Sequence, residues 1–260
     1  MLKRTEGIVL RTISFGEADL IVTYLTHDFG ILKLFAKSPR KIKSRFGSSL
    51  EPLTHSRISF WGKEDASLPR LTQSDIISSF QSIRDYLYSF IKTSEIIELT
   101  IHFAAERDTN RMVYFLLLNT LRDIENNLFT KPTSSPFTKD GNNRDENLII
   151  IHYKVKFLKF MGYTPRLDAC GRCGKSGNYF YISEGSILCG ACANGIDSPI
   201  RVSPTVIKFY NDLLLWDPKK INRIKPSENL LSEVSGIINI HIKYILSRPL
   251  KSESFIYSMR

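Results

Sequence analysis

Two Cys-x-x-Cys pairs constrain the fold of this chain more than any other feature of its sequence. Cys170 and Cys173 form the first pair, Cys189 and Cys192 form the second, and together they are all 4 cysteines of the chain. Two such pairs can supply four thiolates to one tetrahedral zinc ion, at about 2.3 Å per Zn–S bond. The alternative is two disulfides, which require an oxidising compartment. Four protein ligands would close a zinc site, so we expect one Zn²⁺ ion that stabilises structure and performs no chemistry.

The N-terminus and the hydropathy of the chain favour a cytoplasmic protein. Residues 1–6 contain no apolar signal core and no cleavage site. The densest uncharged apolar stretch, residues 113–118, is far shorter than a membrane span. We therefore expect no membrane association, and in the reducing cytoplasm paired cysteines favour metal over disulfide.

The first eighty residues have the pattern of short strands separated by turns. Runs of β-branched, aromatic and aliphatic residues recur at close spacing, with Gly, Asp and Glu between them. Five strands at this spacing predict a small closed sheet, and an OB-type barrel fits the number and length best. A five-stranded SH3-like barrel remains an alternative. The expected strands are residues 7–13, 20–26, 31–37, 57–61 and 68–76.

From about residue 82 the apolar residues recur at helical spacing. Gly162 is a plausible end for one of these helices, since glycine is common just beyond a helix C-terminus. We predict an α+β protein: an OB-fold domain over residues 1–80 and a helical domain over residues 81–260, which contains the zinc-binding module 168–193. The expected helical segments are residues 82–101, 112–128, 148–161, 206–216 and 228–246.

A cluster of basic residues is the second strong signal, in a chain of formal net charge +10. No acidic residue interrupts it between Asp28 and Glu51. Such a cluster could contact several phosphates and release their counterions. Phe46, inside the cluster, is the expected base-stacking aromatic, whereas Phe35 and Phe60 are expected in the barrel core. The predicted nucleic-acid-binding residues are Lys33, Lys37, Arg40, Lys41, Lys43, Arg45 and Phe46.

The sequence contains no catalytic constellation that we can identify. His27, His55, His102, His152 and His241 lie far apart, and none is in a His-Glu-x-x-His pattern. No Gly-x-x-x-x-Gly-Lys-Ser/Thr phosphate loop occurs. We therefore predict that the protein is not an enzyme and has no catalytic residues. A zinc-dependent hydrolase would need a metal site with an open position for water.

Several stretches of the chain resemble the RecO family of bacterial recombination mediators. Each stretch is moderately specific, and their order and spacing strengthen the resemblance. Two departures occur: Gly185-Ser186 replaces a common Gly-Gly turn, and the 129–147 loop is longer than usual. The matching stretches are residues 7–11, 16–19, 23–26, 36–41, 44–48, 50–52, 161–168 and 248–252.

This resemblance implies an OB fold, a helical domain and a zinc module in a cytoplasmic, nucleoid-associated bacterial protein. It also implies binding of single- and double-stranded DNA, strand annealing, and action with RecR to load RecA onto strands covered by single-strand-binding protein. The alternative function is a protein-interaction scaffold whose basic surfaces bind acidic peptides without direct base contact. The acidic C-terminal tail of single-strand-binding protein is one such peptide, and residues 243–251 are candidates to bind it.

Overall fold

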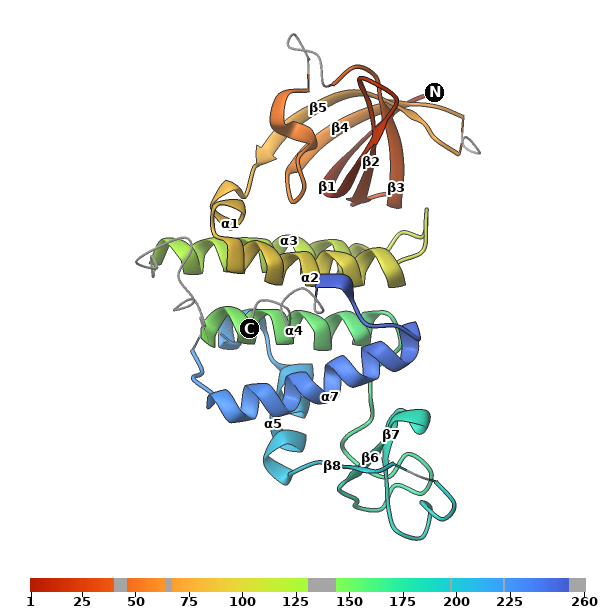
Figure 1. Cartoon of the computed structure of the whole chain (residues 1–260), viewed down its shortest axis with the longest axis vertical. Helices are drawn as coiled ribbons and strands as arrows, with labels where there is room; N and C mark the ends of the chain where they lie inside the picture. The colour runs from red at the N-terminus through yellow and green to blue at the C-terminus, as the bar shows by residue number, and fades with distance from the viewer. Residues whose placement is uncertain (40–45, 64–66, 131–143, 197, 222, 253–260) are drawn as a thin grey trace. The chain divides into compact units, whose positions relative to one another are not determined.

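The computed structural model describes residues 1–39, 46–63, 67–130, 144–196, 198–221 and 223–252. The chain divides into two compact units, Met1–Phe137 and Thr138–Arg260. Figure 1 shows the elements of each unit.

The N-terminal unit begins with a closed five-stranded barrel. Its strand order is β1-β2-β3-β5-β4. β1 pairs antiparallel with both β2 and β4, and a parallel contact between β3 and β5 closes the sheet. This topology confirms the predicted OB-type barrel. The strands are β1 (Leu2–Phe15), β2 (Asp19–Thr26), β3 (Gly30–Ala36), β4 (His55–Trp61) and β5 (Arg70–Ser78), with the 3-10 helix η1 (Gly47–Leu50) between β3 and β4.

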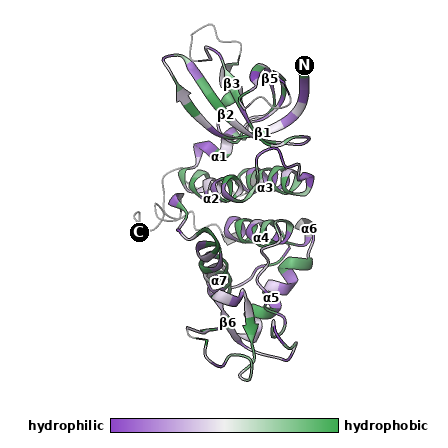
Figure 2. Cartoon of the chain, turned by 90° about the vertical axis from the view of Figure 1, so that its right-hand side faces the viewer, coloured by the Kyte–Doolittle hydropathy of each residue, from purple (hydrophilic) through white to green (hydrophobic). Residues whose placement is uncertain are grey.

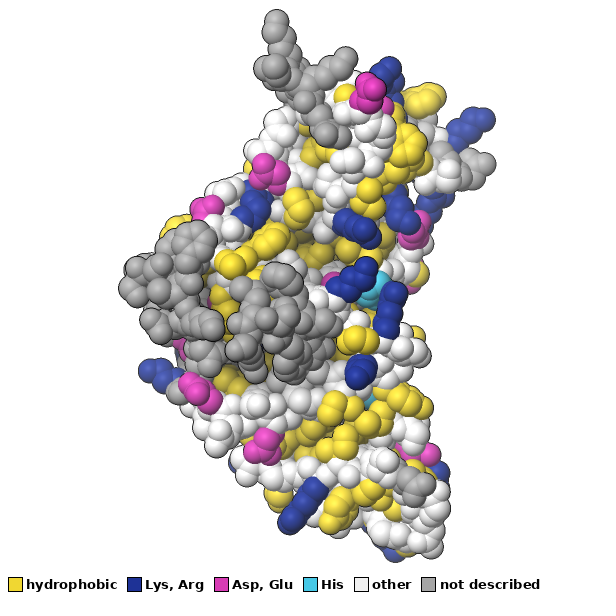
Figure 3. All heavy atoms as spheres, viewed as in Figure 1, with side chains coloured by type: hydrophobic (Ala, Val, Ile, Leu, Met, Phe, Trp, Pro, Cys, Tyr) yellow, Lys and Arg dark blue, Asp and Glu magenta, His cyan; other side chains and the backbone are white. Residues whose placement is uncertain are grey.

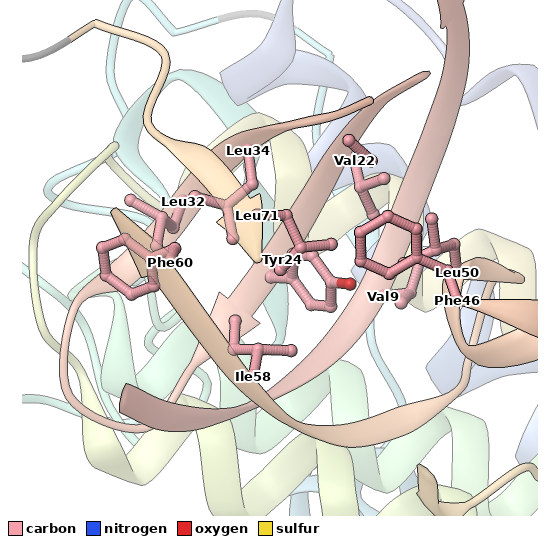
Figure 4. Close-up of a cluster of buried hydrophobic side chains, with 11 residues drawn as sticks. Val9, Val22, Tyr24, Leu32, Leu34, Phe46, Leu50, Ile58, Phe60 and Leu71 are labelled. Atoms are coloured by element: carbon pink, nitrogen blue, oxygen red, sulfur yellow. The ribbon is translucent and has the colours of Figure 1, made fainter. Parts of the chain in front are cut away.

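Alternating apolar residues fill the interior of the barrel. Successive side chains of a strand point to opposite faces, so every second residue points inward. Tyr24 is fully buried at the centre of the cluster, and Figure 4 shows the surrounding side chains converging on it from several strands. The cluster comprises Val9, Val22, Tyr24, Leu32, Leu34, Ala36, Phe46, Leu50, Ile58, Phe60 and Leu71.

β1 is longer than predicted because it pairs with two strands in succession. Its first half, from Leu2 to Ile8, pairs with β4, and its second half pairs with β2. A β-bulge between Val9 and Arg11 shifts the register within the β1–β2 ladder. The polar segment before Gly7 carries little strand signal of its own, so long-range pairing extends this strand.

Three helices complete the N-terminal unit: α1 (Gln81–Asp85), α2 (Leu87–Phe103) and α3 (Arg111–Thr130). The loop between α2 and α3 lies on the β2–β3 hairpin. Gly30 adopts a φ of +61°, and a Cβ atom there would be 2.1 Å from the Asp108 carbonyl oxygen. The barrel ends near residue 80, where we placed the first domain boundary, but the compact unit continues to Phe137.

The C-terminal unit combines helices with a small three-stranded sheet of order β7-β6-β8. The predicted end of the first helix at Gly162 is confirmed: Gly162 has a φ of +79°, and Tyr163 N donates to Leu158 O at 2.8 Å. Lys156 Nζ donates to Leu214 O at 2.9 Å, which satisfies a carbonyl at the C-terminus of α5. The elements are α4 (Arg144–Phe160), β6 (Tyr179–Tyr181), η2 (Ile182–Glu184), β7 (Ser186–Leu188), β8 (Ile200–Arg201), α5 (Pro204–Leu215), α6 (Pro218–Ile221) and α7 (Glu228–Leu246).

The hydropathy of the helices reflects how much of each helix is buried. Helices α2 and α3 each carry both hydrophobic and hydrophilic stretches (Figure 2), whereas residues 148–155 of α4 are buried without interruption, so this helix is the core of its unit. Among the described residues, no helix combines the length and the apolar character needed to cross a membrane.

Candidate functional site

The four cysteines of the two pairs come together in the C-terminal unit. Their Sγ atoms all lie within 4.8 Å of one another, and Cys173 Sγ is 3.5 Å from Cys189 Sγ. No disulfide joins them. Sulfur atoms around a tetrahedral ion with 2.3 Å bonds are about 3.8 Å apart, so only small shifts would give that geometry. The cluster is therefore close enough to hold a metal ion.

Two tight turns bring the sulfur atoms of each pair together. In the first turn, Cys170 O accepts from Gly174 N at 2.9 Å, and Gly174 has a φ of +75° that favours glycine. In the second turn, Cys189 O accepts from Cys192 N at 3.0 Å and from Ala193 N at 3.1 Å. Backbone N–H groups of both turns point toward the sulfur atoms, within a pair and from one pair to the other.

These N–H groups prepare part of the cluster to bind a cation. Hydrogen bonds from the backbone of Cys189, and less from Cys173 and Arg172, lower the pKa of the Cys170 thiol to about 6. The pKa of Cys192 is raised, chiefly because its thiol hydrogen-bonds to Cys173 and Cys189. Four sulfur atoms this close cannot all carry negative charge unless a cation lies between them. A bound metal ion would be that cation.

The rest of the module is tied to the cysteine turns and to α7. Arg172 donates to both carboxylate oxygens of Glu184, at 2.9 and 3.3 Å, and to Cys192 O at 3.0 Å. On α7, the buried His241 ring packs on Phe180, and its Nε2 is 2.9 Å from Tyr163 O. The module is thus anchored on the helical core of its own unit.

The predicted nucleic-acid-binding residues lie in different environments in the structure. Lys37 is exposed at the end of β3. Lys33 is also exposed, but it forms an ion pair with Glu106 from the α2–α3 loop. The remaining cations of the predicted cluster, Arg40, Lys41, Lys43 and Arg45, lie outside the described residues.

Phe46 is not available for base stacking, so that prediction is wrong. Its ring is only 3% exposed and belongs to the barrel core, where Figure 4 shows it beside Val9, Val22 and Leu50. The turn η1 begins directly after it, and Ser49 N donates to Phe46 O at 3.0 Å. Phe46 directly precedes this turn, and its ring fills the barrel interior.

Replacing Phe46 with alanine should therefore reduce stability and leave DNA affinity unchanged. Removing a buried aromatic ring typically costs about 3–5 kcal/mol because it leaves a cavity. Urea unfolding would measure this loss, and DNA binding would be assayed well below the transition. If the variant is as stable as the wild type but binds DNA more weakly, Phe46 is part of the DNA interface after all.

Other aromatic residues lie on the outer face of the barrel. Trp61, at the end of β4, is 60% exposed, and Phe15, at the end of β1, is 52% exposed. The rings of Phe15 and Phe35 meet edge to face at 5.9 Å. Contrary to prediction, Phe35 points outward and is only half-buried, whereas Phe60 is in the core as expected. We define Phe15, Phe35 and Trp61 as the outer aromatic patch.

Strand register places cations among these aromatic residues. Arg70 pairs with Phe35 on one side and with Trp61 on the other, so the three form a row across β3, β5 and β4. On β1, Ile13 extends this row through its pairing with β2. The side chain of Arg11, two residues before Ile13, is exposed. Within the described part of the chain, no ion pair involves Arg11, Lys37 or Arg70. Sequence analysis missed Arg11 and Arg70 because their strands, β1 and β5, come to share this face only through long-range strand pairing.

The outer aromatic patch occupies the face that OB folds use for binding. In OB folds, strands 2 and 3 and the loops β1–β2 and β4–β5 contact oligonucleotides and oligosaccharides. Phe15 precedes the first of these loops, and Trp61 and Arg70 flank the second. Figure 3 shows one face of the molecule, on which Lys and Arg side chains gather over the lower part of the barrel and over α2 and α3.

Comparison with known proteins assigns both units to one family. The family model "Recombination protein O N terminal" matches residues 1–80, and "Recombination protein O C terminal" matches residues 138–254. A DNA repair protein RecO from Thermodesulfovibrio yellowstonii is 41% identical over 248 residues, which cover 93% of this chain and 92% of the relative.

More distant relatives carry the same name. The DNA repair protein RecO of Syntrophus aciditrophicus is 31% identical over 96% of this chain and 93% of its own length. That of Dehalococcoides mccartyi strain CBDB1 is 30% identical over 99% and 96%, respectively. None of these names describes an enzymatic activity. The closed OB barrel, the cysteine cluster and the matches along both units together show that this chain belongs to the RecO family of DNA repair proteins.

Proposed function

We propose that this protein binds single-stranded DNA across the outer face of its barrel. The observation that carries the proposal is the row Phe35–Arg70–Trp61, flanked by the exposed cations Arg11 and Lys37. Single-strand-binding OB folds stack bases on aromatic rings while a cationic groove follows the backbone. The predicted cations Arg40, Lys41, Lys43 and Arg45 follow within eight residues of Lys37 in sequence and would extend the phosphate contacts.

On this basis the protein acts as a recombination mediator in the bacterial cytoplasm. It anneals complementary strands, also binds double-stranded DNA, and acts with RecR to load RecA onto strands covered by single-strand-binding protein. Family membership supports this activity, and the proposed interface supplies its DNA-binding step. Annealing of complementary oligonucleotides with and without single-strand-binding protein would test it.

We also propose that the cysteine cluster holds one structural Zn²⁺ ion. Cys170, Cys173, Cys189 and Cys192 offer four sulfur ligands and leave no position for a reacting water, which suits a structural zinc site. Bound zinc would neutralise the thiolates and hold the two turns together. The proposed role in the cell is therefore stabilisation of the C-terminal unit.

Neutralising three neighbouring cations should weaken DNA binding and flatten its salt dependence. With six phosphate contacts to single-stranded DNA, log K should fall with log salt at a slope of about −4. The combined variant Lys37→Gln, Arg40→Gln and Lys41→Gln would remove three of these contacts and bring the slope to about −2. Fluorescence anisotropy of a labelled oligo-dT at several salt concentrations measures both slopes. A wild-type slope near zero, or no change in the triple variant, would contradict the proposal.

A further inference from the structure

The outer face of β2 and β3 is divided into a covered part and an open part. By strand alternation Leu25 and Ile31 point away from the barrel interior, yet they are only 2% and 3% exposed. Phe35, four residues after Ile31 on the same strand face, lies in the open part beside Phe15. Lys33 is midway between Ile31 and Phe35, so it marks the edge where the open part begins.

The α2–α3 loop forms the covered edge, and its backbone holds it there. Glu106 forms a parallel β-bridge with Ile31, and Arg107 N donates to Ile31 O at 3.0 Å. The close approach of Asp108 to Gly30 leaves no room for a side chain between the loop and the hairpin. Glu106 is therefore fixed by main-chain contacts and does not depend on its own side chain for its position.

Charged groups of both signs meet at this edge: Asp28, Glu106 and Asp108 are accompanied by Lys33, Arg107 and Arg111. Glu106 forms the ion pair with Lys33, the cation nearest to the loop on β3. Asp28, on the adjacent hairpin turn, accepts from Thr5 at 2.9 Å and from Arg111 at 3.1 Å. Partial burial raises the pKa of Asp28, but hydrogen bonds from Thr5, His27 and Arg111 outweigh this effect and the net pKa is lowered. This carboxylate is therefore charged at neutral pH.

We infer that Glu106 determines where the path of single-stranded DNA ends on the barrel. Its carboxylate pairs with Lys33, which would otherwise be free to contact a phosphate of a strand that continues past Phe35. The DNA is thereby confined to the open part of the face, toward Lys37, Arg70 and the β1–β2 and β4–β5 loops. This inference rests on the proposed function and assigns a specificity-determining residue to its interface.

Replacing Glu106 with glutamine should release Lys33 for DNA. One additional phosphate contact makes the salt slope for oligo-dT steeper by about 0.7, which is a gain in affinity of about fivefold at 0.1 M salt. Because exposed ion pairs contribute little to stability, the variant should keep the wild-type melting temperature. Glu233→Gln, an exposed change of the same charge on α7 in the other unit, is the matched control and should leave the slope unchanged.

Lys33→Gln distinguishes this mechanism from a general change in charge. In the wild-type background it should alter the slope little, because Lys33 is already paired with Glu106. In the Glu106→Gln background it should cancel the gain. The inference is wrong if Glu106→Gln leaves the slope unchanged, or if Lys33→Gln flattens the slope equally in both backgrounds.

The same titrations separate this inference from the proposed function. If wild-type binding is insensitive to salt and to the Lys37, Arg40 and Lys41 substitutions, the proposed interface itself fails. If those substitutions flatten the slope while Glu106→Gln behaves as Glu233→Gln does, the interface stands and the role of Glu106 alone is rejected.

Discussion

Replacing Cys170 with serine is expected to unfold the zinc-binding module and leave the barrel folded. Structural zinc of this kind provides on the order of 10–16 kcal/mol of apparent binding free energy, and a hydroxyl is a poor substitute for the lost thiolate. Cys170 is also the fully buried cysteine of the cluster, packed against Tyr181 and Leu188. The variant should contain less than one zinc ion per chain and should lose hydrogen-exchange protection over the module.

DNA binding should decline in this variant only as solubility is lost. A chelator added to the wild-type protein should reproduce the effect, whereas Ser183→Ala, an exposed change inside the module, should not. Full zinc content and unchanged stability in Cys170→Ser would contradict a four-cysteine site. Loss of DNA affinity in a soluble, folded variant would place the module in the interface.

Local sequence patterns predicted most of the elements because each has its own signal. Runs of β-branched, aromatic and aliphatic residues between turn residues predicted the strands, helical spacing predicted the helices, and the cysteine spacing predicted the cluster. Ser203-Pro204 has the form of a helix start, and Ser203 Oγ accepts from Val206 N at 3.3 Å in the structure. These features depend on residues close together in the chain, so the sequence contains the information needed.

Features that depend on long-range packing were missed. The loop that carries Glu106 is about 70 residues from Lys33, and only the folded unit brings the two together. Arg11, Trp61 and Arg70 share one face through the pairing of distant strands, and no local pattern shows which strands become neighbours. Phe46 has basic sequence neighbours, which suggested exposure, but its ring fills the barrel interior directly before the η1 turn.

Removing the outer aromatic patch should abolish most binding of single-stranded DNA. Loss of an aromatic that stacks on a base typically costs about 1–3 kcal/mol, so Trp61→Ala should weaken binding roughly 5- to 150-fold. The double variant Phe35→Ala and Trp61→Ala should lose more, although neighbouring changes need not add. Trp61 is exposed, so its replacement should cost little stability.

Tyr244→Ala is the matched control for these substitutions. Tyr244 is a similarly exposed aromatic, 54% accessible, on α7 in the C-terminal unit. It should bind oligo-dT as the wild type does. Equal losses in Tyr244→Ala and Trp61→Ala would show that the assay responds to surface aromatics in general and would remove the support for the barrel face.

Tryptophan fluorescence tests the central claim most directly, because the chain has only 2 tryptophans. Trp216 lies in the C-terminal unit, packed against Phe209, so Trp216→Phe leaves Trp61 as the single reporter. If DNA crosses the barrel face, titration with oligo-dT should strongly quench Trp61 fluorescence, with the same midpoint as anisotropy. In the reciprocal Trp61→Phe protein, Trp216 fluorescence should not change. Tight binding of DNA with no change in Trp61 fluorescence would contradict the account.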